Sequence, residues 1–189
     1  MKSNPAHEVL DDELIKAIVT FVIEKLREEE EKASKTRHDK IISTVKLLLS
    51  RYRFIVDFAD NATFEAARLD DDPELQDAMY AMTDGRGSFR SEVSSENALK
   101  ARAAKARTVA DHVSRMFECY RRSAERSGKP EEMRRYRVVK ALYFDEMPPT
   151  VDEVAEIERV DLRTVYNDID NAADRLAVFF FGVYGLRFF

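Results

Sequence analysis

The sequence contains very few of the residues that interrupt helices or crosslink a chain. Among its 189 residues there are one cysteine, no tryptophan, five glycines and five prolines. The lone Cys119 excludes an intrachain disulfide and fits a reducing compartment, so we expect a cytoplasmic protein. No apolar run approaches the ~20 residues that span a bilayer, and no apolar signal core follows Met1, so we expect no membrane partner.

Residues that commonly carry catalysis or hold metals are also scarce. His7, His38 and His112 are scattered, and no pair of histidines or cysteines has the spacing of a zinc site. The acidic run at 70–72 lacks the spaced ligands and glycine of a calcium loop, and the glycines around 85–87 lack the context of a phosphate loop. We therefore expect neither an enzyme nor a bound cofactor.

Charge is unevenly distributed along the chain, whose formal net charge is −5. Residues 1–85 carry 12 basic and 19 acidic side chains, residues 86–129 carry 11 and 5, and residues 130–189 carry 8 and 12. A basic helix expected over residues 100–126 has two possible roles: it contacts phosphates, or it pairs with the acidic N-terminal region. Pairing with the acidic N-terminal region is favoured slightly, because residues 1–85 carry an excess of acidic side chains.

Apolar residues recur at helical spacing over most of the sequence, and no useful strand pattern occurs. The pattern predicts an all-α fold. One helix is expected over 9–33 and a second over 37–60, paired as a long antiparallel hairpin through a short polar connection. Asn61 offers a cap for a short helix, and Pro73 fits the first turn of another.

The glycines near residue 85 mark the best linker. We expect an N-terminal helical region over 1–82, a linker over 83–98 and a C-terminal helical region over 99–189. Within the last of these, a helix from about Ser95 to Ser127 precedes one from Pro130 to about Phe144. The core of a helix-turn-helix follows, within about residues 130–182.

Two capped amphipathic helices joined by a short turn lie within residues 149–172. Thr150 with Glu153 has the spacing of a capping box, and Asp161 can cap a second helix that begins at Leu162. A turn is expected over 158–160, although the usual turn glycine is absent and Arg159 stands near its position. The buried positions are expected to be Val151, Val154, Ala155, Ile157 and Val160 before the second helix, and Val165, Ile169, Ala172 and Leu176 within it.

This periodicity leaves polar side chains facing outward near the start of the second helix, the half with which a recognition helix reads DNA. Arginine can donate two bonds to guanine and asparagine pairs with adenine, whereas threonine and tyrosine suit phosphate or methyl contacts. Acidic Asp168 and Asp170 lie on the same helix and either face away or limit affinity. The candidate DNA-binding residues are Arg163, Thr164, Tyr166, Asn167 and Asn171.

The segment RRYRVVKALYFDEMPPTVDEVAEIERVDLRTVYNDIDNAADRLAVFFFGVYGL resembles the sigma-factor region-4 type of helix-turn-helix. More narrowly, it is similar to the phage-encoded ArpU and RinA type of late transcription regulator. The resemblance covers about residues 134–186. It implies a bacterial or prophage transcription regulator that binds promoter DNA and contacts RNA polymerase.

We therefore expect a transcription regulator that binds double-stranded DNA, and we expect a homodimer. The N-terminal hairpin and the aromatic tail at 176–189 are both candidate dimer contacts. Two alternatives remain open: a DNA-packaging adaptor resembling a small terminase subunit, and a helical module that binds another protein.

Overall fold

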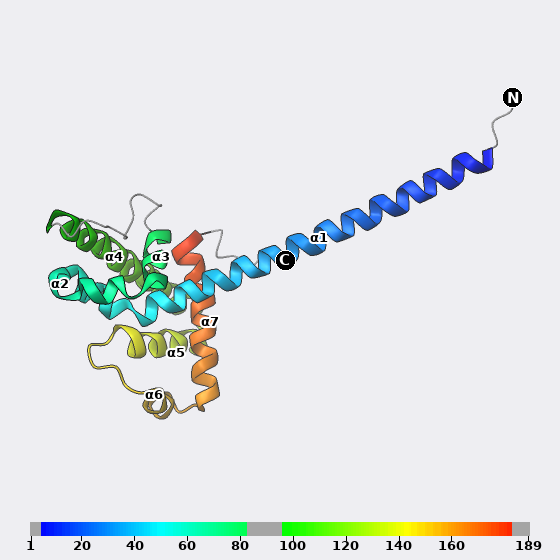
Figure 1. Cartoon of the computed structure of the whole chain (residues 1–189). Helices are drawn as coiled ribbons and strands as arrows, with labels where there is room; N and C mark the ends of the chain where they lie inside the picture. The colour runs from blue at the N-terminus through cyan, green and yellow to red at the C-terminus, as the bar shows by residue number, and fades with distance from the viewer. Residues whose placement is uncertain (1–4, 83–95, 183–189) are drawn as a thin grey trace. The chain divides into compact units, whose positions relative to one another are not determined.

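The computed structural model describes the backbone of residues 5–82 and 96–182, and the side chains of these residues except 5–19, 22, 62–68 and 96–98. Within these ranges the chain is helical and contains no strand, as the composition predicted (Figure 1). Its elements are α1 (Pro5–Ser50), α2 (Tyr52–Asp70), α3 (Pro73–Met82), α4 (Glu96–Ser127), α5 (Pro130–Val139), the π-helix η1 (Lys140–Phe144), α6 (Val151–Glu158) and α7 (Leu162–Phe181). No described helix is apolar enough over sufficient length to span a membrane.

The predicted hairpin of helices 9–33 and 37–60 is wrong, because α1 continues from Pro5 to Ser50 without a turn. No glycine or proline occurs between Pro5 and Pro73, so nothing in the local sequence ends the helix there. Thr36 stays within it by donating its hydroxyl to the Lys32 carbonyl at 2.9 Å. The residues of α1 up to Asp39 belong to one compact unit, and the described residues from Lys40 on belong to another, which contains the core and the candidate site.

The helical structure is interrupted near Asn61 and Pro73, where the sequence indicated breaks. Asn61 has non-helical backbone angles (φ −131°, ψ 43°), so α2 is kinked there. Pro73 is the first residue of α3. An N–H at this position has no partner within the helix, so proline, which lacks one, loses no hydrogen bond there. The Asp72 carboxylate accepts the Leu75 N–H at 3.0 Å and thereby caps this helix.

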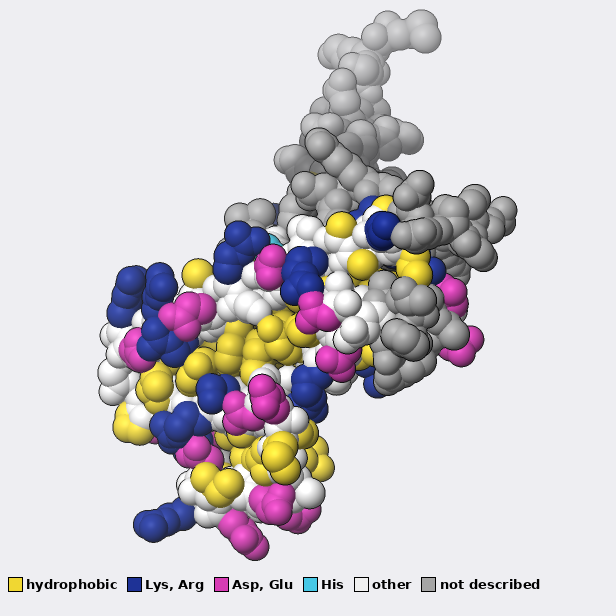
Figure 2. All heavy atoms as spheres, turned by 90° about the vertical axis from the view of Figure 1, so that its left-hand side faces the viewer, with side chains coloured by type: hydrophobic (Ala, Val, Ile, Leu, Met, Phe, Trp, Pro, Cys, Tyr) yellow, Lys and Arg dark blue, Asp and Glu magenta, His cyan; other side chains and the backbone are white. Residues whose placement is uncertain are grey.

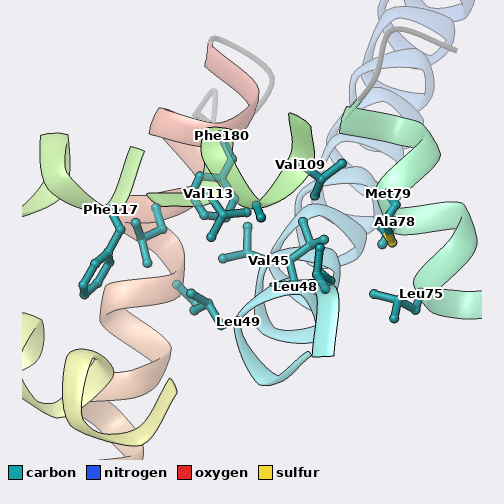
Figure 3. Close-up of a cluster of buried hydrophobic side chains, with 14 of the residues drawn as sticks. Val45, Leu48, Leu49, Leu75, Ala78, Met79, Val109, Val113, Phe117 and Phe180 are labelled. Carbon is teal, nitrogen blue, oxygen red and sulfur yellow. The ribbon is translucent and has the colours of Figure 1, made fainter. Parts of the chain in front are cut away.

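The main apolar core joins residues from both sides of the predicted linker at 83–98, most of which lies outside the described residues. Figure 3 shows the core side chains of α1, α3, α4 and α7 converging on one cluster. Val45, Leu48, Val113 and Leu176 are each fully buried in it. Residues 40–82 are consequently packed against the C-terminal region and form no separate core.

The basic helix α4 pairs with acidic residues of α2, as the charge distribution favoured. Arg102 donates to the Asp70 carboxylate, and Arg107 donates to Asp60. Arg121 bonds within α4 to Glu118, and this pairing lowers the pKa of Glu118 to about 2. Much of the positive charge of α4 is therefore neutralised within the protein.

A smaller core lies beneath the helix-turn-helix. It joins α5 and η1 to α6 and α7 through Val138, Leu142, Val154, Val165 and Ile169. The predicted helix over 130–144 is confirmed, although its last five residues form a π-helical turn. The C-terminal half of α7 contributes to the main core and its N-terminal half to this smaller one, so both cores fix the same helix.

Candidate nucleic-acid interface

The first helix of the pair, α6, begins with the predicted capping box. The Thr150 hydroxyl accepts the Glu153 N–H at 3.2 Å, and the Glu153 carboxylate accepts the Thr150 N–H at 2.7 Å. These bonds satisfy amides that have no partner within the helix, and they lower the pKa of Glu153. The start of α6 is thus fixed by adjacent residues.

The turn between α6 and α7 closes without glycine. Arg159 adopts the left-handed conformation, with φ 55° and ψ 48°, where many helix pairs have glycine. The Val160 N–H then reaches the Ala155 carbonyl at 3.0 Å, and Val160 packs partly buried against the smaller core. The missing turn glycine is therefore replaced by a strained arginine, and the turn itself is retained.

Asp161 caps α7, as predicted. Its carboxylate accepts the Thr164 N–H at 2.7 Å and the Thr164 hydroxyl at 2.9 Å, which lowers the pKa of Asp161. Thr164 was expected to face outward, but it is only half exposed and its hydroxyl is engaged in the cap. Its first role is thus to fix the start of the helix.

The inner face of α7 holds a charge as well as apolar groups. Asp168 is 2% exposed, and its two carboxylate oxygens accept hydrogen bonds from Arg134 at 2.6 and 3.2 Å. Arg135 lies 3.5 Å from the same carboxylate. Asp168 therefore points toward α5, away from any ligand on the outer face, and its charge is compensated.

Four of the five predicted DNA-binding residues are exposed together on the outer side of α7. Arg163, Tyr166, Asn167 and Asn171 all face solvent, and Tyr166 is 56% exposed although it is aromatic. The Asn171 amide donates to the Asn167 carbonyl at 2.7 Å. The outer face thus presents a guanidinium, a phenol and two amides within two to three helical turns.

The charge around this face is mixed. Asp170 lies on the outer side of α7, where Lys46 of α1 pairs with it at 2.7 Å. The hollow beside the turn is lined by Asp152, Glu156 and Asp161, with Arg159 among them. Figure 2, viewed from the left-hand side of Figure 1 and so not onto the outer side of α7, shows basic and acidic side chains interspersed on that other face as well. A ligand of the outer face of α7 would meet individual donors and, by the residues named above, no broad basic patch.

Ile157 was expected to face inward, and that prediction is wrong. Its side chain is 70% exposed on α6, because Val154 and Ala155 already fill the contact with α7. Met147, in the loop before α6, is 90% exposed. The region around α6 therefore presents exposed apolar side chains in addition to the polar outer face of α7.

Sequence reasoning missed the ion pair between Arg134 and Asp168 beneath α7. Arg134 and Asp168 are 34 positions apart, so no local spacing connects them. The only available signal was the helical phase of Asp168, which lies three residues after buried Val165 and one before buried Ile169.

Among the described residues, no three histidine, cysteine or acidic side chains gather as a metal site. No protein-family model, curated protein or solved structure matches this chain. The functional argument therefore depends on the geometry and chemistry of the site itself.

Proposed function

We propose that this protein is a transcription regulator that binds double-stranded DNA through α7. The observation that carries the proposal is the two-sided character of that helix. Its inner side is fixed by two apolar cores and the Arg134–Asp168 pair, while Arg163, Tyr166 and Asn167 are exposed outside. A rigid helix with exposed, hydrogen-bonding side chains at its N-terminal half is what reading a major groove requires.

In the proposed complex, the N-terminal half of α7 enters the major groove. Arg163 donates two hydrogen bonds to a guanine, and Asn167, one turn further on, bonds to an adenine. Tyr166 contacts a thymine methyl group or a phosphate. Thr164 lies at the edge of this face, and Asn171 extends it by one further turn.

The mixed charge leads to a specific expectation about salt. The turn and the outer face of α7 carry few exposed cations, namely Arg159 and Arg163. With no more than about two charged contacts per copy, a plot of the logarithm of affinity against the logarithm of salt concentration should have a slope no steeper than about −2 per copy. Base contacts would then supply a large share of the specificity.

The first unit offers a surface for dimer formation. Phe21, Ile23 and Leu26 of α1 are 60%, 45% and 55% exposed, in a stretch whose neighbouring residues are also mostly apolar. A helix that is apolar on several sides is usually buried against another helix. We propose that a second copy of α1 covers this stretch, so that two reading helices face two half-sites.

Selection of binding sites from a random pool of duplex DNA, followed by anisotropy titration with the selected site, tests the proposal. We expect a defined site whose affinity falls on substitution of Arg163 or Asn167. Light scattering on the same samples tests the dimer, which Phe21→Glu with Leu26→Glu should convert to a monomer. Eight or more copies would instead favour the packaging adaptor.

A protein-binding module remains the second candidate, and the exposed Ile157 and Met147 favour it. Apolar side chains surrounded by acidic ones suit a protein surface that is apolar and basic. For a regulator, the resemblance implies that RNA polymerase would be such a partner. Absence of any salt-dependent DNA affinity at low ionic strength would leave protein binding as the better account.

A further inference from the structure

A pocket of about 150 Å³ lies where the end of α4, the start of α5 and the second half of α7 meet. Tyr120 and Ser123 of α4, Lys129 and Glu132 at the start of α5, and Arg175 of α7 line it. One water needs only about 10–15 Å³, so the pocket has room for a group of several atoms. It lies apart from the outer face of α7 and has no role in the function proposed above.

Tyr120 lines this pocket, and its buried hydroxyl has no hydrogen-bond partner among the described residues. Tyr120 is only 1% exposed, so its hydroxyl is withdrawn from bulk water. Burial, together with the negative charge of Glu132, raises the pKa of Tyr120, so the group keeps its proton and remains a donor. A buried donor left without an acceptor is unfavourable, which indicates that something outside the protein accepts this bond.

The charges in the pocket define what that acceptor is. Arg175 is largely exposed and lies 3.9 Å from Glu132, a weak contact, and Lys129 is exposed nearby. Glu132 is almost buried and bonds to Arg135 at 2.6 Å. The cations Arg175 and Lys129 and the hydroxyls of Tyr120 and Ser123 favour a ligand with several oxygen acceptors. The carboxylate of Glu132 favours a ligand that also has one O–H donor.

We propose that this pocket binds a phosphate group that retains one proton, such as hydrogen phosphate or the end of a phosphomonoester. Arg175, Lys129 and the hydroxyls of Tyr120 and Ser123 donate to its oxygens, and its remaining O–H donates to Glu132. A backbone phosphate of DNA has no O–H and would be repelled by Glu132. The free phosphate or phosphomonoester is therefore the favoured source over nucleic acid.

The pocket is connected to the inner face of the proposed reading helix. Glu132 bonds to Arg135, which lies 3.5 Å from Asp168, and Asp168 is held by Arg134. A ligand that pairs with Arg175 would rearrange the charges around Glu132 and would thereby affect the ion pairs that support α7. This regulatory consequence rests on the proposed DNA binding, whereas phosphate binding itself does not.

Calorimetric titration of the full chain with inorganic phosphate near pH 7, without DNA, tests the site. We expect saturable binding of one phosphate per chain, weakened about tenfold or more in Tyr120→Phe and in Arg175→Gln. Arg126→Gln, which removes an exposed cation of α4 outside the pocket, is the control and should bind normally. Sulfate, which carries no proton near neutral pH, should bind about tenfold more weakly.

Thermal unfolding in phosphate-free buffer gives an independent readout. Tyr120→Phe should be at least as stable as the wild type there, and it should gain less stability from added phosphate. Equal binding of sulfate, equal weakening in Arg126→Gln, absence of saturable binding, or loss of stability of Tyr120→Phe without phosphate would each overturn the proposal. A DNA duplex that competes for the pocket would show the backbone to be the ligand instead. Apart from that competition, none of these outcomes bears on whether the outer face of α7 binds DNA.

Discussion

Removing the carboxylate of Asp168 should destabilise the helix-turn-helix more than any exposed charge change on α7. Asp168 accepts two hydrogen bonds from Arg134, and its side chain is 3% exposed while that of Arg134 is 24% exposed. Breaking a fully buried ion pair costs about 3–5 kcal/mol, because the remaining charge loses its partner. Water still reaches Arg134, so we expect about 2–3 kcal/mol for Asp168→Ala.

Substitution of Arg134, alone and together with Asp168, separates the contribution of the ion pair to stability from that of packing. Asp168→Leu with Arg134→Met removes both charges and should recover more than half of the loss, because no uncompensated charge remains. A double-mutant cycle should give a coupling free energy of about 1 kcal/mol or more. The matched control is Asp174→Ala, which removes an exposed carboxylate from the same helix.

Urea unfolding provides the measurement. The urea midpoint should shift while the slope of the unfolding free energy against urea concentration stays constant, since the same surface is exposed on unfolding. Additive effects of the two single substitutions, or a loss for Asp168→Ala no greater than for Asp174→Ala, would show that the pair does not support α7.

Further predictions concern the turn, the caps and the core. Arg159→Gly should raise the free energy of unfolding by about 1 kcal/mol relative to Arg159→Ala, because glycine accepts the left-handed conformation; equal unfolding midpoints would contradict this. The pKa values of Glu153 and Asp161 lie below their ordinary values of 4.5 and 3.8, so their stabilisation is complete above about pH 5 and is lost as pH falls further. Glu153→Gln with Asp161→Asn should therefore flatten the acid side of a stability–pH curve, and an unchanged slope would count against the caps. Phe117 stacks on Phe144 with ring centroids 4.0 Å apart, and Phe117→Ala should cost about 3–5 kcal/mol in urea unfolding; a loss below about 1 kcal/mol would refute its place in the core.

The starts of α6 and α7 could be predicted closely because they depend on neighbouring residues. Thr150 and Asp161 cap their helices through bonds that reach only three positions along the chain. Such local chemistry is visible in the sequence as spacing. The exposure of Arg163 and Asn167 follows from the same helical periodicity.

Other features depend on contacts that the sequence does not display. The turn expected between residues 33 and 37 had no breaker to support it, so α1 continues. Ile157 was placed inside because it is apolar, yet an apolar residue can remain exposed where the contact is already filled. The Arg134–Asp168 pair joins distant positions, and only the fold brings them together.

Affinity for a selected DNA duplex, compared between wild type and variants of the outer face of α7, tests the central claim most directly. Arg163→Ala and Asn167→Ala should each weaken binding by roughly 5- to 150-fold, corresponding to about 1–3 kcal/mol for a paired base contact. Arg107→Ala, whose side chain pairs with Asp60 within the protein, should bind nearly as well as wild type. Undiminished binding by both α7 variants, or an equal loss in Arg107→Ala, would contradict DNA reading by this helix.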